Sequence, residues 1–263
     1  MQYNENTVYY KDTLMTYVRE WKNISFEEAR FNEVDALLLC QMMNLQMEWL
    51  VPKLKSGVHD SYAWRSPNRI QTIGWADMER NEDLLYGDSV YGTMYADLFH
   101  EIKDSRRFGE IRLGCMRALK DQKKMVQFAA LTAWLDDENA VVLFRGTDSS
   151  LVGWREDFKY AYIRTWPAHT LAREYLMDVA RLIPEKLYVA GHSKGGNLAV
   201  YASALVPAYV QKRIRKIYSY DGMGFRSSFY KTEGYQRISD KVYKLVPAES
   251  LIGMLFVPEK GFK

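Results

Sequence analysis

The stretch that most restricts the fold of this chain is residues 187–203, LYVAGHSKGGNLAVYAS. A short apolar run with aromatic and β-branched residues is typical of a buried strand, and the Ala- and Leu-rich run after the glycines is typical of a helix. The pattern predicts a strand over 186–191 and a helix over 195–206. A sharp turn must join them, with Ser193 at its apex.

Gly191 to Gly195 form a G-x-S-x-G motif within this turn. Such a pentapeptide also occurs by chance, as a glycine-rich turn with an ordinary serine. A strand that runs into the motif and a helix that leaves it are the context of a nucleophile elbow. We therefore expect Ser193 to be a nucleophile and the backbone N–H of Lys194 to be an oxyanion donor. The order GHSKGG does not match a phosphate-binding P-loop.

The second half of the chain alternates between strand and helix patterns. Residues 125–135 and 140–146 are typical of a β-hairpin. A helix over 170–183, a strand over 215–220 and a strand over 241–246 complete the pattern. This alternation predicts an α/β fold with a mostly parallel sheet and helices on both faces.

The first half of the chain favours helices. We expect helix over 24–50, where residues 25–28 fit a capping box and Asn32 could cap a second start. Helix is expected again over 93–124 with a break near Gly109, and loops with short helices over 51–92. The 263 residues are expected to form a single domain. In it, residues 1–124 are a mainly helical N-terminal flank or cap, and residues 125–263 are a sheet core that lacks its C-terminal end.

Composition excludes several classes of function. The net charge of +3 is too small to indicate nucleic-acid binding. The histidines are dispersed and the two cysteines stand alone, so no metal site is expected. No dinucleotide fingerprint is present, so no cofactor is expected. The sequence shows no signal peptide and no transmembrane run, which favours a cytoplasmic protein.

A second oxyanion donor is suggested by FRGTD (144–148) followed by GWREDF (153–158). This segment resembles the F-R-G-T…W…D segment of class 3, fungal-type lipases, in which the residue after the glycine lies in the oxyanion hole. The resemblance implies that role for Thr147. The alternative is simple turn chemistry after a strand.

A wider resemblance covers residues 14–255. The chain resembles a family of uncharacterised bacterial lipase-like α/β-hydrolases. The matching pieces are Y-x-x-x-W (17–21), FNEVD (31–35), FRGTDSSLVGWREDF (144–158), GHSKGGNLAVYAS (191–203), YDGMGF (220–225) and VPAESLIGML (246–255). The resemblance implies an α/β-hydrolase fold and a serine-hydrolase lineage, and it implies no particular substrate.

Two carboxylates compete for the acid of a catalytic triad, which in this fold follows the nucleophile and precedes the histidine along the chain. Asp221 follows the strand 215–220 and opens the turn D-G-M-G. Glu249 occupies the equivalent place one strand later. Asp221 is the first choice and Glu249 the second.

The base is missing from its expected place, because none of the four histidines follows Asp221; they are His59, His100, His169 and His192. Serine is a weak nucleophile without a neighbouring base. Three explanations stay open: the sequence stops before the histidine, the fold has lost catalysis, or a histidine from elsewhere, His169 or His59, reaches the site. Side chains of neighbouring residues point apart on this turn, so His192 is expected to pack or to support the elbow.

The sequence therefore predicts a lipase- or esterase-like serine hydrolase acting on a small-molecule or lipid acyl ester. The alternative is a non-catalytic binding or scaffold protein on the same fold. Because the base is not found after the acid, we expect ester hydrolysis by these 263 residues to be weak or undetectable.

Overall fold

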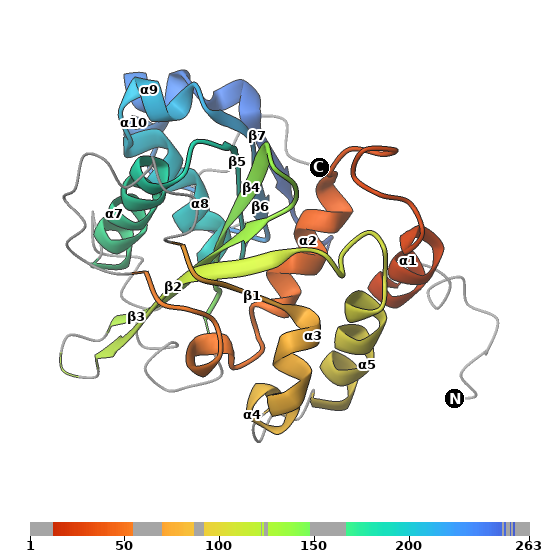
Figure 1. Ribbon diagram of the computed structural model, residues 1–263. Helices are drawn as coiled ribbons and strands as arrows, with labels where there is room; N and C mark the ends of the chain where they lie inside the picture. The colour runs from red at the N-terminus through yellow and green to blue at the C-terminus, as the bar shows by residue number, and fades with distance from the viewer. Residues whose placement is uncertain are drawn as a thin grey trace, which may run out of the picture.

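The computed structural model describes residues 13–54, 70–86, 92–121, 123, 126–147, 167–248, 250, 253 and 255. Within them, one seven-stranded sheet lies at the centre of the fold, and its strands follow one another in space in the same order as in sequence (Figure 1). The strands are β1 (Thr72–Gly74), β2 (Arg112–Asp121), β3 (Val126–Trp134), β4 (Asn139–Phe144), β5 (Lys186–His192), β6 (Ile214–Tyr220) and β7 (Val242–Leu245).

The sheet is mixed. Strands β1 to β4 pair antiparallel, whereas β4 to β7 pair parallel. The hairpin of β3 and β4 and the later parallel strands confirm the predictions for residues 125–246. With helices on both faces, this is an α/β-hydrolase-type fold.

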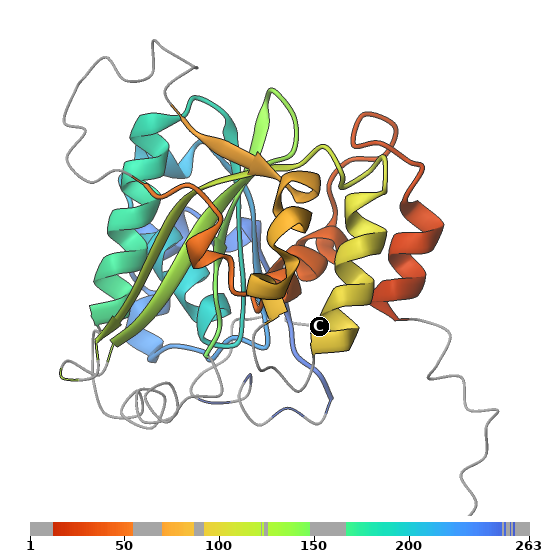
Figure 2. The same ribbon diagram turned by 60° about the horizontal axis from the view of Figure 1, so that its bottom comes forward.

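The order of the strands decides where the connecting helices lie. Parallel connections are right-handed, and β4 to β7 advance across the sheet in one direction, so every connection returns over the same face. On that face lie α7 (Pro167–Leu182), α8 (Lys194–Leu205), α9 (Ala208–Gln211), α10 (Ser227–Tyr230), α11 (Glu233–Gln236) and η6 (Ser239–Lys241). Figure 2 shows this layer on one side of the sheet.

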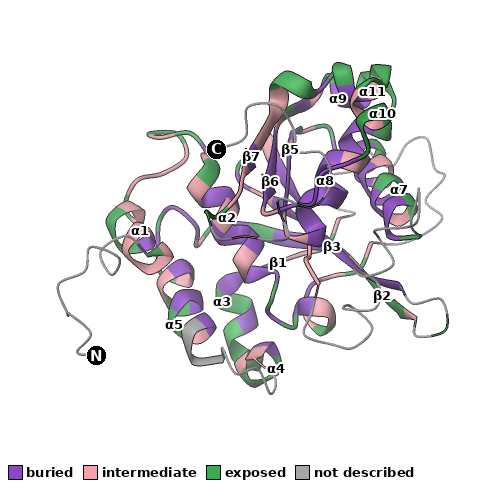
Figure 3. Cartoon of the chain, turned by 180° about the vertical axis from the view of Figure 1, so that it is seen from behind, coloured by how far each residue is buried: buried purple, intermediate pink, exposed green. Residues whose placement is uncertain are grey.

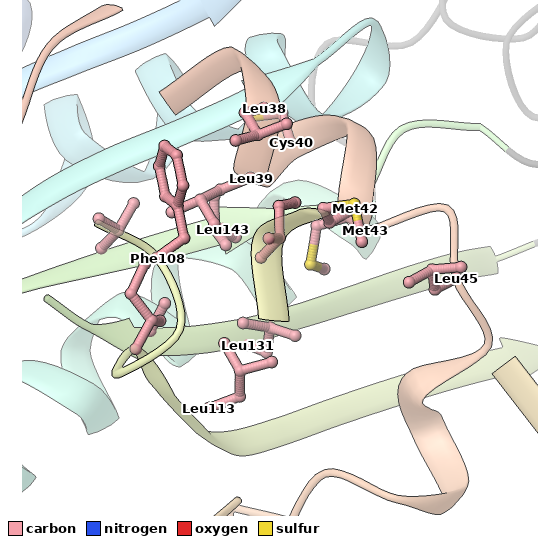
Figure 4. Close-up of a cluster of buried hydrophobic side chains, with 14 of the residues drawn as sticks. Leu38, Leu39, Cys40, Met42, Met43, Leu45, Phe108, Leu113, Leu131 and Leu143 are labelled. Carbon is pink, nitrogen blue, oxygen red and sulfur yellow. The ribbon is translucent and has the colours of Figure 1, made fainter. Parts of the chain in front are cut away.

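The opposite face would meet water without the N-terminal part of the chain. It is covered by α1 (Leu14–Trp21), α2 (Glu33–Met42), η2 (Met47–Trp49), α3 (Trp75–Met78), η5 (Glu79–Asn81), α4 (Glu82–Tyr86) and α5 (Gly92–Lys103). Buried side chains of α2, such as Leu39 and Met42, pack with Leu131 of β3 and Leu143 of β4 (Figure 4). The N-terminal helices are therefore part of the hydrophobic core.

Two hydrophobic clusters sandwich the sheet. Side chains alternate along β4, so Leu143 joins the cluster beneath α2 and Val142 joins the cluster beneath α7 and α8. The central strands are accordingly buried on both faces (Figure 3). Because β4 is covered on both faces, its side chains form an uninterrupted apolar run.

Residues 93–124 do not stay helical as expected. Helix α5 ends at Lys103, and residues 112–121 form β2. This strand pairs with β1 on one side and β3 on the other, and such pairing overrides the helix propensity of residues like Leu113 and Ala118. The sheet therefore reaches into the segment that was expected to be a mainly helical flank.

Residues 24–50 also differ from the predicted helix. The capping box forms, with Ser25 N–H donating to Glu28 Oε2 at 2.8 Å, but only a turn follows. Arg107 Nη1 donates a 3.0 Å hydrogen bond to the carbonyl oxygen of Ala29, which a helix continuing past residue 29 would need as an acceptor. The helix begins at Glu33, the second predicted start, and Asn32 caps it as expected.

A buried ion pair explains two of the motifs near the N-terminus. Arg107 Nη2 lies 2.6 Å from Asp35 Oδ2, and both side chains are fully buried. Tyr17 donates a hydrogen bond of 2.9 Å to Asp35 Oδ1 and accepts one of 2.8 Å from Asn32 Nδ2. The Arg107 guanidinium also lies 5.1 Å from the centre of the Trp21 ring. The Y-x-x-x-W and FNEVD motifs thus join α1, α2 and the turn after α5.

None of the helices in the described residues combines the length and the hydropathy that a membrane crossing requires. The described part of the chain also contains no group of three or more His, Cys, Asp or Glu side chains placed to hold a metal ion.

Candidate active site

Ser193 lies between β5 and α8 with φ 54° and ψ −123°. A residue with a side chain rarely takes this backbone conformation, which costs on the order of 1–3 kcal/mol. The side chain is half-buried, so its hydroxyl is not sealed in the core. A strained serine at a strand-to-helix turn is the geometry of a nucleophile elbow.

The glycines of the motif permit this turn by close contact. A Cβ on Gly195 would collide with the carbonyl oxygen of Phe144, and a Cβ on Gly191 would collide with the backbone of Gly195. A Cβ on Gly146 would lie 2.8 Å from the carbonyl oxygen of His192. The end of β4, which leads into Thr147, is therefore pressed against the elbow.

Lys194 is the first residue of α8, so its backbone N–H belongs to the open end of that helix. Its side chain leaves the site: it is 1% exposed, and its ammonium donates a 2.9 Å hydrogen bond to the carbonyl oxygen of Gln127 on β3. A contribution of Lys194 to chemistry at Ser193 would come from its backbone.

Asp221 lies directly beside the elbow, at the end of the neighbouring strand. His192 on β5 pairs with Tyr220 on β6, and Ser193 N–H donates to Tyr220 O at 2.8 Å. Asp221 follows Tyr220 with φ 51°, a left-handed conformation. The two residues therefore leave adjacent parallel strands at the same edge of the sheet.

The carboxylate of Asp221 is held by Ser250 and Gly253, for which the sequence predicted no such role. Asp221 Oδ1 accepts hydrogen bonds from the Ser250 hydroxyl and from Gly253 N–H, the latter at 3.0 Å. A Cβ on Gly253 would collide with the same carboxylate oxygen. The only signal in the sequence was the VPAESLIGML piece of the resemblance, which carries both residues.

The second-choice acid, Glu249, lies outside the described residues, as do Asp148 and the 153–158 segment. Its neighbour Ser250 contacts Asp221.

The histidines differ in their surroundings, and His59 lies outside the described residues. His100 pairs with Glu82 across α5 and α4, with Nε2 2.8 Å from Glu82 Oε1. His169 on α7 is buried, and its ring stacks on Tyr201 with the ring centres 3.8 Å apart. His169 Nε2 also lies 2.8 Å from Asn197 Oδ1.

His192 is half-buried, and burial lowers its pKa while the negative charge of Asp221 opposes that shift. By alternation along β5, its side chain lies on the same face as Tyr188, beneath α2. Among the described residues, no imidazole hydrogen-bonds the Ser193 hydroxyl.

A cavity of about 240 Å³ opens at the opposite edge of the sheet. It is lined by residues near the starts of β5 and β6, such as Tyr188 and Arg215, and by the hairpin turn at Asp136. It is thus separate from the elbow, which lies where β5 ends.

A strained serine at the end of a central strand, with a carboxylate on the next strand, marks the chain as a protein of the α/β-hydrolase class. The chain belongs to the Mbeg1-like family, which matches residues 102–261.

Two solved structures follow a similar chain path. The crystal structure of M37 lipase has 13% identity and a TM-score of 0.43, over 61% of this chain and 62% of that one. A fungal lipase–inhibitor complex, described as a model for interfacial activation in lipases, has 16% identity and a TM-score of 0.38, over 70% of this chain and 76% of that one. Comparison with curated proteins finds no match.

Proposed function

We propose that this protein is a lipase- or esterase-like serine hydrolase, formed by residues 1–263 as a single α/β-hydrolase-like domain. The observation that carries the proposal is the strained backbone of Ser193 at the end of β5, next to Asp221 at the end of β6. Strain of this kind persists where the surrounding structure maintains it and is concentrated at active sites.

In the proposed reaction, Ser193 Oγ attacks the carbonyl carbon of an acyl ester and loses its proton to a base. The negative oxygen of the tetrahedral intermediate is stabilised by the backbone N–H groups of Lys194 and Thr147. The alcohol then leaves with a proton, and water hydrolyses the acyl-serine to release the acid. Asp221 orients the base.

The position of Thr147 is supported by the contact of Gly146 with the elbow. The choice of Asp221 over Glu249 is supported by the Ser250 and Gly253 hydrogen bonds, which hold its carboxylate in a fixed place. The proposed substrate is a small-molecule or lipid acyl ester, and the reaction needs no cofactor or metal.

A second function is favoured by one specific observation. No imidazole among the described residues hydrogen-bonds Ser193, and a serine without a base is a weak nucleophile. A hydrolase fold that binds an acyl compound without cleaving it fits this arrangement. The two proposals differ in whether Ser193 is chemically activated.

Covalent labelling separates them. If Ser193 is activated, a fluorophosphonate probe labels the folded wild-type protein and Ser193→Ala removes the label. Ser228→Ala, which removes an exposed hydroxyl on α10, is the matched control and should keep the label. Folded wild-type protein that takes up no label would favour the binding protein. Rapid, Ser193-dependent ester turnover would contradict the expectation of weak hydrolysis and require a base within these residues.

A further inference from the structure

Asn197 makes buried polar contacts to two other parts of the site. It lies in the first turn of α8, one turn after Ser193, and is 3% exposed. Its Nδ2 is 3.0 Å from Met223 O and 3.4 Å from Gly224 O, and its Oδ1 is 2.8 Å from His169 Nε2. One amide thus joins α8, α7 and the loop after β6.

These contacts fix the orientation of the amide and the tautomer of the histidine. Carbonyl oxygens only accept hydrogen bonds, so the NH₂ group of Asn197 must face Met223 and Gly224. Its Oδ1 therefore faces His169, and His169 Nε2 must carry the hydrogen. The ring of His169 is held in place by stacking on Tyr201.

The loop that Asn197 holds is the one that starts at Asp221. Gly222 lies flat against α8, since a Cβ there would be 2.9 Å from the backbone nitrogen of Asn197. On its other side, Gly224 N–H donates to Leu255 O at 3.0 Å. The loop is therefore fixed to the helix that follows the nucleophile and to the segment that braces the Asp221 carboxylate.

We infer that Asn197 is a positioning residue that holds the loop starting at Asp221 against helix α8, which follows Ser193. His169 acts through Asn197, because its hydrogen bond fixes the orientation of the Asn197 amide. This inference rests on the proposed function insofar as Asp221 is the catalytic acid. We call the hydrogen bonds of Asn197 the clasp, and without them the loop that starts at Asp221 would lose this attachment to α8.

The structure offers a matched control for Asn197. Gln211 is also buried, and its Nε2 donates to three backbone carbonyls: Ser203 O at 2.9 Å, and Ala204 O and Gly234 O at 3.0 Å each. Replacing Gln211 with Leu removes hydrogen bonds of the same kind at the other end of α8. A loss of stability alone would therefore appear in both variants.

Hydrogen exchange of single amides in full-length protein tests the inference without relying on activity. In Asn197→Leu, the amides of Gly224 and Gly253 are expected to exchange roughly tenfold faster or more. The amides of β5 should exchange as in the wild type once any change in the global free energy of unfolding is taken into account. In Gln211→Leu, the Gly224 and Gly253 amides should exchange as in the wild type. Wild-type exchange at both glycines in Asn197→Leu would overturn the inference.

Asn197→Asp separates the two halves of the clasp. Aspartate still accepts from His169 Nε2–H but cannot donate to Met223 O and Gly224 O when ionised. The low-field imidazole N–H resonance of His169 should therefore persist in Asn197→Asp and disappear in Asn197→Leu, whereas fast exchange of Gly224 should occur in both. Absence of this resonance from the wild type would contradict the assigned tautomer.

The failure of the inference and the failure of the proposed function give different results. If the wild type takes up no fluorophosphonate but the Gly224 and Gly253 amides exchange faster in Asn197→Leu, the inference on Asn197 is supported and the hydrolase proposal is contradicted. If Asn197→Leu is labelled at the wild-type rate and its Gly224 and Gly253 amides exchange as in the wild type, the hydrolase proposal is supported and the inference on Asn197 is contradicted.

Discussion

Ser193 and Asp221 leave adjacent parallel strands, and both have a positive φ, 54° and 51°, which residues with a side chain rarely adopt. Each comes directly after a residue of the pair His192 and Tyr220, and Ser193 N–H bonds Tyr220 O at 2.8 Å. A positive φ at a strand end redirects the chain sharply. Both side chains are thereby brought to the rim of the sheet rather than into either hydrophobic cluster.

Replacing Ser193 with glycine should reveal the strain at the elbow. Glycine adopts φ 54° and ψ −123° without the clash of a Cβ, so Ser193→Gly is expected to be about 1 kcal/mol more stable than Ser193→Ala. Urea unfolding of the two variants measures the difference. Equal midpoints and equal slopes would show that this backbone conformation carries no strain.

Breaking the buried ion pair should destabilise the N-terminal layer strongly. Asp35→Ala leaves the Arg107 guanidinium charged and buried, which is expected to cost about 3–5 kcal/mol of the free energy of unfolding. Glu101→Ala removes a surface pair with Arg19, whose side chain is 60% exposed, and is expected to cost less than about 1 kcal/mol. Urea unfolding followed by far-UV circular dichroism compares the two. Similar losses in both variants would contradict the special role of the buried pair.

Acid should destabilise the protein through His169. Burial lowers the pKa of His169 to about 4, although its hydrogen bond with Asn197 opposes the shift, against about 6.5 in an unfolded chain. Between these values the unfolded chain takes up a proton that the folded protein does not. The free energy of unfolding should therefore be highest above pH 6.5 and fall by up to about 3 kcal/mol as the pH drops to 4.

His169→Phe keeps an aromatic ring to stack on Tyr201 and removes the titrating group. Its unfolding free energy should depend less on pH in this window than that of the wild type. His192, whose pKa burial also lowers, contributes in the same direction and remains in the variant. An undiminished pH dependence in His169→Phe would place the proton uptake elsewhere.

The elbow could be predicted from sequence because its causes are local. The apolar run of β5, the small residues at 191 and 195, and the helix-forming run after them lie within 17 neighbouring residues. The same holds for the hairpin of β3 and β4 and for Asp221 at the end of β6. In each case the neighbours along the chain carry the pattern.

The strand β2 could not be predicted in this way. Its residues favour a helix when considered alone, and they form a strand because β1 and β3 supply hydrogen-bonding partners on both sides. The helix start at Ser25 likewise does not continue, because Arg107, 78 residues away, binds the carbonyl oxygen of Ala29.

The amino-acid sequence by itself determined the turn at Ser193 and the alternation of strands and helices, since hydrophobic period and glycine placement act over a few residues. Only the tertiary structure decided what surrounds that turn. Ser250 and Gly253 reach Asp221 across 29 and 32 residues, and Asn197 meets His169 across 28. Such contacts form only when the packed sheet brings distant segments together, because the hydrogen bonds of buried polar groups must be satisfied wherever the chain path allows.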